Sequence, residues 1–292
     1  MPRIICAGLI AVDLVFEVAQ YPTAGTKNRA STAHLIPGGG AMNAASAIAG
    51  LGADVCLAGA VGRDEFGTFL RKKMDERQID STHVLVLPGV RTPSSTVLLT
   101  PNGDRTIINH RDQAFSAFDI NLPEPFGFDA ALVDTRWPDG ALRILEAAQR
   151  AGKPGVVDAE APVKIASEAL GLATHIIFSE QGLTDYIGAC DALALKAAAL
   201  RLGTWCAVTR GASSVLCHDG RMKIEAPAVP VNVQNTLGAG DVWHGAFTLA
   251  LARGRREIDA VKWANAAASL KVSRPVRSEH FPTAAETDAV KR

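Results

Sequence analysis

Short runs of apolar residues alternate with helix-like segments along most of this chain, and no other sequence feature constrains the fold as strongly. The runs are apolar at nearly every position, which is typical of strands covered on both faces of a parallel sheet. We therefore predict an α/β fold, a doubly wound and mostly parallel sheet with helices on both faces. The predicted strands cover residues 4–8, 55–60, 130–134, 155–158, 175–178 and 205–209. The predicted helices cover residues 41–51, 65–77, 140–151, 163–170, 191–202, 241–252 and 258–272.

Two regions, from about residue 14 to 36 and from about residue 94 to 110, interrupt the alternation with strand-like and turn-like residues. In the second region, the turn sequence PNGD at 101–104 separates two β-rich runs and predicts a hairpin. We expect both regions to form a small β-sheet that stands off the main sheet as a lid or a dimer contact. Residues 1–292 would then form a single α/β domain with a β lid.

Charge and composition favour a small-molecule partner. Thirty basic and thirty acidic residues give a formal net charge of zero, so the chain lacks the net positive field that gathers nucleic acid or an anionic membrane. The first apolar stretch is broken by Gly8 and ends at Asp13, which is too short to span a membrane. We expect a cytoplasmic protein. The five cysteines are scattered without metal-ligand or CxxC spacing, which predicts reduced structural thiols.

A glycine-rich turn precedes the predicted helix at 241–252. Its small residues Gly238, Ala239 and Gly240 let the backbone approach a ligand, and free amide groups at a helix start attract anions. Asp241 would repel a phosphate there, unless its carboxylate faces an acceptor hydroxyl and takes the proton during phosphoryl transfer. The alternative is that Asp241 only caps the helix. The turn is neither a Walker loop nor a GxGxxG loop.

The sequence NTLGAGD at 235–241 resembles the C-terminal signature of the ribokinase-like (PfkB) carbohydrate kinases. The sequence GGGAMNAA at 38–45 resembles the N-terminal signature of the same family, and the likeness extends over essentially the whole chain. The resemblance implies an ATP-dependent carbohydrate kinase with Asp241 as the catalytic base. It also implies that the amides of Gly238, Ala239 and Gly240 bind the moving phosphoryl group.

The resemblance also assigns a nucleotide side and its cations. Thr209 and Gly211 match a T-x-G turn beside the phosphates and ribose, and the helix carrying Asn265 and Ala268 matches the helix that flanks the adenine. Ser179, a predicted nucleotide-binding residue, replaces the asparagine of an N-x-x-E motif that organises Mg²⁺, and Gly182 replaces its glutamate. Magnesium is still expected because phosphoryl transfer needs charge neutralisation, with Glu180 as the remaining candidate ligand. Asn235 replaces an aspartate near a monovalent-cation site, which puts activation by K⁺ in doubt.

On the sugar side, Asp13 follows the first predicted strand and resembles the sugar-binding aspartate of the family, since a carboxylate can accept hydrogen bonds from two hydroxyls. Gly39, Gly40 and Asn43 match positions whose backbone and amide contact the sugar.

Three further polar residues indicate which sugar the site would bind. Lys27, Asn109 and Arg136 resemble the sulfonate-binding residues of the sulfofructose kinase branch, although each could equally be a solvated surface group. The resemblance thus implies 6-deoxy-6-sulfofructose, phosphorylated at O1. Fructose, ribose, a keto-deoxy sugar acid or a nucleoside remain alternatives within the class. A catalytically silent sugar-binding regulatory protein is the alternative from another class, kept open by the altered N-x-x-E motif. His244 is assigned no role, and Trp137 and Trp243 are expected to be buried.

Overall fold

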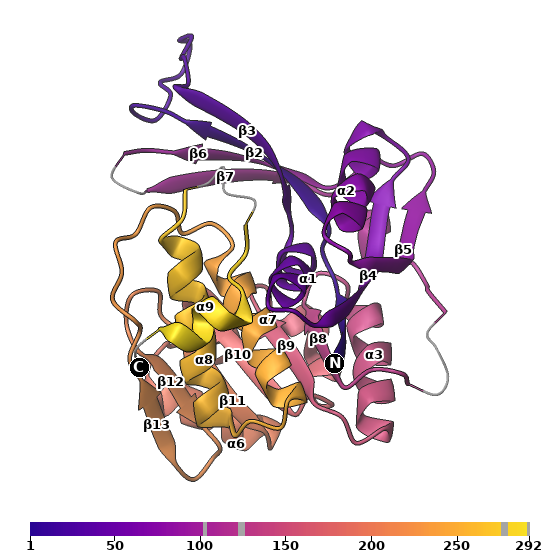
Figure 1. Cartoon of the computed structure of the whole chain (residues 1–292), viewed down its shortest axis with the longest axis vertical. Coiled ribbons are helices and arrows are strands. Elements are labelled where there is room, and N and C mark those ends of the chain that lie inside the picture. The colour runs from indigo at the N-terminus through magenta and orange to yellow at the C-terminus, as the bar shows by residue number, and fades with distance from the viewer. Residues whose placement is uncertain (102–103, 122–125, 276–279, 291–292) are drawn as a thin grey trace.

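The structure, a computed structural model, describes residues 1–101, 104–121, 126–275 and 280–290. Within these residues, nine strands form the main sheet in the order β13-β12-β11-β10-β9-β8-β1-β4-β5 (Figure 1). The strands are β1 (Arg3–Ala7), β4 (Asp54–Gly62), β5 (Asp80–Leu87), β8 (Ala130–Asp134), β9 (Gly155–Ala159), β10 (His175–Ser179), β11 (Trp205–Thr209), β12 (Val215–His218) and β13 (Lys223–Ala226). All neighbours from β11 to β5 pair in parallel, whereas β12 and β13 are antiparallel edge strands.

The chain reverses its direction of travel across the sheet beside β1. After β1 it continues to β4 and β5 on one side, and later to β8, β9, β10 and β11 on the other. Such a switch point opens a crevice at the carboxyl ends of the strands, where open α/β sheets bind their ligands. The loops after β1 and β8 therefore lie where a site is expected.

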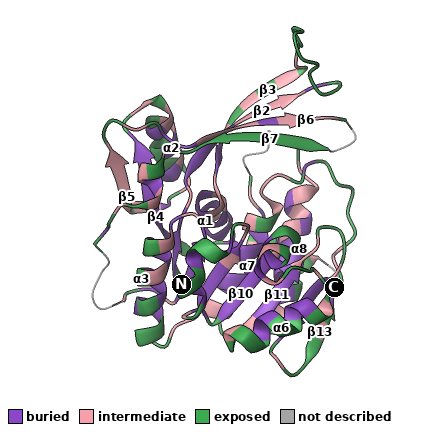
Figure 2. Ribbon diagram, turned by 180° about the vertical axis from the view of Figure 1, so that it is seen from behind, coloured by how far each residue is buried: buried purple, intermediate pink, exposed green. Residues whose placement is uncertain are grey.

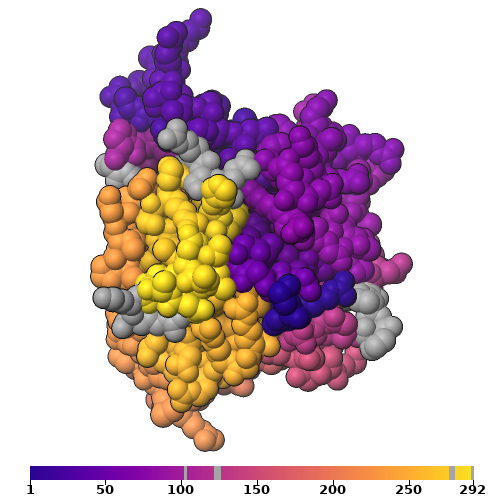
Figure 3. Space-filling model, in the orientation of Figure 1, coloured from indigo at the N-terminus to yellow at the C-terminus, as the bar shows by residue number. Residues whose placement is uncertain are grey.

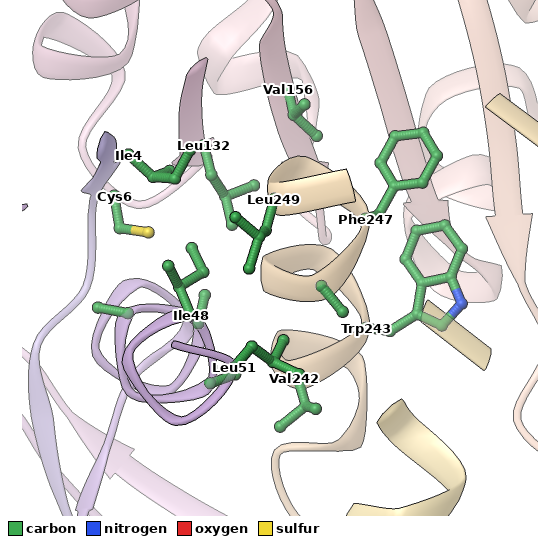
Figure 4. Close-up of a cluster of buried hydrophobic side chains, with 14 of the residues drawn as sticks. Ile4, Cys6, Ile48, Leu51, Leu132, Val156, Val242, Trp243, Phe247 and Leu249 are labelled. Atoms are coloured by element: carbon green, nitrogen blue, oxygen red, sulfur yellow. The ribbon is translucent and has the colours of Figure 1, made fainter. Parts of the chain in front are cut away.

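Helices cover both faces of the sheet, and successive strand residues contribute to two different cores. Ile4 and Cys6 of β1 pack with α1, α2, α7 and α8, whereas Ile5 and Ala7 pack with α3, α4, α5 and α6. Figure 4 shows part of the first core, where Val242 and Leu249 lie on the side of α7 that faces α1, and Phe247 lies beside Trp243 on its other side. The helices are α1 (Gly40–Gly50), α2 (Glu65–Glu76), α3 (Pro138–Arg150), α4 (Ser167–Leu170), α5 (Glu180–Ile187), α6 (Ala192–Leu202), α7 (Ala239–Ala252), α8 (Glu257–Val272) and α9 (Ala284–Ala289).

A second sheet lies across the end of the body, above the helices in Figure 1. Its order is β3-β2-β6-β7, with β2 and β6 parallel and the two outer pairs antiparallel. It is far less buried than the main sheet (Figure 2), and the segment between β2 and β3 projects beyond it as the uppermost indigo part of Figure 3. The strands are β2 (Ala11–Glu17), β3 (Thr32–Gly38), β6 (Ser94–Leu99) and β7 (Arg105–His110).

The predicted fold class is confirmed, with small differences in the elements. The predicted helix at 163–170 is a 3₁₀ turn (Lys164–Ala166) followed by the short helix α4. The small sheet begins at Ala11, earlier than the expected residue 14, and the hairpin of β6 and β7 forms as predicted. Residues 102 and 103 of its turn lie outside the described residues. Across the described ranges, no helix combines the length and apolar character that crossing a bilayer requires.

Candidate active site

The start of α7 is built to attract an anion. Gly238 takes the N-cap position with a φ of 71°, a left-handed conformation that favours glycine, and no side chain caps the helix. The first amide groups of a helix lack partners within it, and the helix dipole places partial positive charge at the same point. The turn from Gly238 to Gly240 therefore presents amide groups to a negatively charged ligand, although the Ala239 amide donates to the Thr236 carbonyl over 3.3 Å.

Asp241, in the first turn of α7, is tied to the start of α1. The side-chain amide of Asn43 donates a hydrogen bond from Nδ2 to Asp241 Oδ2 over 2.8 Å, although the two residues are 198 positions apart. The two helices approach closely, since a Cβ atom on Gly245 would lie 2.8 Å from the carbonyl oxygen of Ala44. The structure thus brings the two glycine-rich segments to one place.

Three carboxylates surround Gly40. A Cβ atom on this glycine would lie 3.4 Å from Asp134 Oδ2, 3.6 Å from Asp158 Oδ2 and 3.7 Å from Asp241 Oδ1. Asp134 also organises the switch-point loops, because its Oδ2 accepts from the Leu9 amide over 2.7 Å. Neither Asp134 nor Asp158 was predicted from the sequence as a site residue. Each ends a predicted strand, where the switch-point rule could have identified it.

Burial and mutual repulsion change the acidity of this cluster. Burial, followed by the charge of Asp158, raises the pKa of Asp241 to about 7. Burial, followed by the charge of Asp134, raises the pKa of Asp158 to about 8. His244 lies with Nδ1 at 3.5 Å from Asp158 Oδ2, and burial lowers its pKa to about 4, so the ring is neutral. A carboxyl with a pKa near 7 can exchange protons at neutral pH, as a general base requires.

Asp13 lies near Asn43 and the glycine turn. It is only 7% exposed, and burial raises the pKa of its carboxyl to about 6. It lines a small cavity of about 40 Å³ together with Asn43 and Gly238. In the lid sheet, Asp13 pairs with Ser95 and Ser95 pairs with Asn109, so the three side chains lie in one row on one face.

Lys27 and Arg136 do not join this row. Lys27 is exposed in the segment that projects between β2 and β3. Arg136 follows β8, where its backbone amide donates to Asp134 Oδ1 over 2.8 Å, and it lines a different small pocket with Arg111 and Trp137. The three predicted sulfonate-binding residues therefore do not line a single cavity in this structure.

A cavity of about 600 Å³ lies on the other side of the glycine turn. Asn265 lines it, but its side chain is fixed because Oδ1 accepts from Trp243 Nε1 over 2.7 Å and Nδ2 donates to the Pro227 carbonyl over 2.8 Å. Arg105 of the lid reaches its wall and donates to Thr236 Oγ1 over 2.7 Å. Two residues of the glycine turn, Ala239 and Gly240, line this cavity. So do four of the predicted nucleotide-side residues: Thr209, Gly211, Asn265 and Ala268.

Ser179 and Glu180 are not part of this cavity wall. The Ser179 hydroxyl accepts from the Gly182 amide over 2.9 Å and caps α5, and Glu180 is exposed in the first turn of that helix. The serine at this position therefore has a structural use, and its nucleotide contact stays a prediction.

The fold and this site define a phosphotransferase, with an anion cradle, an adjacent carboxylate and two flanking cavities. The model of the pfkB family carbohydrate kinases matches residues 1–284. The chain therefore belongs to the pfkB family and is an ATP-dependent carbohydrate kinase.

Similar proteins are found among both sequences and structures. The chain is 28% identical to the ribokinase of Bacillus subtilis over 281 residues, which cover 93% of each protein. A crystal structure from Agrobacterium tumefaciens with a provisional ribokinase assignment superposes with a TM-score of 0.93 at 33% identity, covering 98% of this chain and 96% of that one. The Arabidopsis thaliana ribokinase complexed with ribose and ATP has a TM-score of 0.81 at 22% identity, covering 98% and 97%, which supports the fold.

Proposed function

We propose that the chain transfers the γ-phosphate of ATP to a hydroxyl of a small anionic sugar, with Asp241 as the base. The observation that carries this proposal is the hydrogen bond of 2.8 Å between Asn43 and Asp241, which unites the sugar-side and phosphate-side segments. In this reading, Asp13 and Asn43 hold the sugar, and the Asp241 carboxylate takes the proton of the attacking hydroxyl. The amides of residues 238 to 240 stabilise the negative charge on the transferred group.

The position of the small sheet β3-β2-β6-β7 supports a role as a lid that excludes water. The Arg105 side chain of β7 reaches Thr236, just before the glycine turn at residues 238 to 240. A lid held over the acceptor would favour the sugar over water as the nucleophile, and it would hold the reacting atoms in line. The lid residues Asp13 and Asn109 would then contact the sugar from above.

Magnesium fits the acidic side of the site. No cluster of three or more metal-ligating side chains is found in the described residues, but Mg²⁺ beside a nucleotide usually needs only one or two carboxylates and the phosphates. Asp158 is a suitable holder because burial and a neighbouring carboxylate raise its pKa, a cost that a cation offsets. Glu180 remains the second candidate. When bound, the ion would neutralise phosphate charge.

The substrate within this class is proposed to be 6-deoxy-6-sulfofructose, phosphorylated at O1. Asn109 supports this because it lies in one row with Asp13, and Arg136 supports it because it lies at the carboxyl end of β8. Similarity to the Bacillus subtilis ribokinase favours ribose instead. Fructose, a keto-deoxy sugar acid and a nucleoside are the other candidates. A coupled assay of ADP release with this panel separates them, and no turnover with any sugar would favour a silent binding protein.

Replacing Arg136 by methionine tests the anionic substituent. We expect KM for sulfofructose to rise about 10- to 100-fold, because a charge-assisted hydrogen bond is lost, while KM for fructose changes little. The measurement is ADP release against sugar concentration. The matched control is Arg221→Met, at an exposed arginine beside β13, which should leave both constants unchanged. An equal loss for both sugars would remove the case for an anion.

We further propose that two copies associate through the outer face of the lid. The row of Leu35, Leu14, Thr96 and Ile108 faces away from the buried pair Val15 and Val97. Leu35 and Ile108 are 41% and 65% exposed, which is unusual for an apolar row on a sheet.

Replacing Ile108 by lysine should therefore convert the dimer to a monomer, because the added charge would be desolvated at the contact. Sedimentation velocity measures the change. Ile165→Lys, at an isoleucine of the body that is 49% exposed, is the control and should leave the mass unchanged. A wild-type monomer at micromolar concentration would contradict the proposal.

A further inference from the structure

Lys271, in the last turn of α8, is a largely buried lysine that lines a small cavity and has no carboxylate partner among the described residues. It is only 9% exposed, and it forms neither an ion pair nor a side-chain hydrogen bond within the described ranges. Its Nζ lies 5.8 Å from the ring centre of Phe281. Withdrawing an unpaired ammonium from most of its water is unfavourable, even after relaxation. Packing alone does not explain a lysine here, because a methionine would fill the same space without that cost.

The ammonium lies behind the phosphate turn. Lys271 lines the small cavity that also contains Asp13, Asn43, Asn235 and Gly238. The turn formed by residues 235 to 240 thus separates Lys271 from the larger nucleotide-side cavity, which is lined by Ala239 and Gly240.

The backbone holds this arrangement in register. The carbonyl of Val272, the residue after Lys271, accepts hydrogen bonds from the amides of Gln234 (2.8 Å) and Asn235 (3.1 Å). The end of α8 is thereby fixed to the start of the phosphate turn. The Lys271 ammonium therefore keeps a fixed position relative to the backbone amides of residues 238 to 240.

Both acidic and basic groups lie near the Lys271 ammonium. Asp13 and Asp241 bring carboxylates to this side of the turn. Burial, followed by the charges of Arg77 and Arg274, lowers the pKa of Lys271, and the attraction of Asp241 opposes that shift. The other cations nearby are engaged: Arg77 donates to Ser46 Oγ over 2.8 Å, and Arg274 pairs with Glu286 over 2.6 Å. Asn235 is neutral, and its Oδ1 already accepts from the Leu237 amide over 2.9 Å. An additional monovalent cation does not fit beside an ammonium and a guanidinium.

We propose that Lys271 is a positioning residue for phosphoryl transfer, supplying the fixed positive charge behind the 235–240 turn. This inference rests on the proposed kinase function. The charge offsets Asp13 and Asp241 and adds to the field of the backbone amides, where negative charge gathers in the transition state. The chain therefore works without an added K⁺ ion.

The test compares monovalent cations with charge variants of the full-length protein. Turnover of the best sugar in the panel, with Mg²⁺ and ATP, is measured in potassium, sodium and tetramethylammonium salts. Wild-type kcat should agree among them within about twofold. Lys271→Met should lower kcat about tenfold or more, because a preorganised charge is lost. Added ammonium or ethylammonium should restore part of that loss, and Lys271→Arg should keep most of the wild-type kcat.

Lys262→Met, at an exposed lysine of the same helix, is the matched control and should change nothing. A merely structural role would predict no rescue by ethylammonium. Wild-type turnover that requires K⁺, or a Lys271→Met variant with wild-type kcat, would overturn the inference while leaving the kinase function intact. Absence of sugar-dependent ADP release under every salt would overturn both. The wild-type salt comparison remains decisive even if Lys271→Met does not fold.

Discussion

Replacing Asp241 by asparagine should lower kcat by a factor of about 10² to 10⁴, the usual contribution of a positioned general base. The substitution keeps the side-chain shape, and the new amide oxygen can still accept from Asn43 Nδ2, so sugar binding should survive. Coupled ADP release gives kcat, and a thermal-shift titration gives sugar binding. Wild-type turnover should rise with pH through a midpoint near 7, because the base acts only when deprotonated and burial raises its pKa to about 7.

The control for this experiment is Asp75→Asn, at an exposed aspartate near the end of α2, which should retain full turnover. The folded state of Asp241→Asn should be no less stable at pH 8. A carboxyl whose folded pKa is raised costs stability as pH increases above its unfolded value, and the amide avoids that cost. Turnover within about threefold of wild type would exclude Asp241 as the base.

Replacing Phe247 by alanine should destabilise the protein by about 3 to 5 kcal/mol, the range for a large buried aromatic. Phe247 is fully buried in α7, and its ring stacks on Trp205 and Trp243 with centroids at 5.3 Å and 5.1 Å (Figure 4). The edge of His175 closes the cluster at 5.6 Å. The truncated side chain leaves a cavity that these rigid rings cannot fill.

Urea unfolding measures this loss, with the midpoint and the slope fitted separately. Phe69→Ala, at a partly exposed phenylalanine of α2, is the control, and its cost should be less than half as large. Because Trp243 also lines the nucleotide-side cavity, the Phe247 variant should in addition bind ATP more weakly. A loss below about 1 kcal/mol would show that the aromatic stack relaxes freely.

Local patterns predicted the secondary structure because strands and helices depend on short-range periodicity. The strand at 130–134 was predicted to the residue, since five consecutive buried residues leave little choice of element. The region at 163–170 was less well predicted. Its amphipathic pattern fits a helix, but the structure stops the α-helix at four residues after a 3₁₀ turn.

The site was predictable only where chemistry is concentrated in a short segment. Glycines before a helix and the following Asp241 favour an anion site, and the resemblance to the pfkB signature favoured this interpretation over a simple helix cap. In contrast, Asp134 and Asp158 end separate strands, and only the pairing of β8 with β1 and β9 places them around Gly40. Lys27 carries a sequence signal but is exposed in the projecting segment, and its contact with the sugar stays a prediction.

The sequence by itself determined the α/β architecture, the small second sheet and the glycine turn before α7, because backbone preferences and apolar periodicity act over a few neighbouring residues. Only the tertiary structure decided which side chains meet: Asn43 with Asp241, three carboxylates around Gly40, and Lys271 behind the turn. The physical reason is that burial and Coulomb interactions depend on distance in space, and helix and strand packing brings together residues that are far apart in the chain.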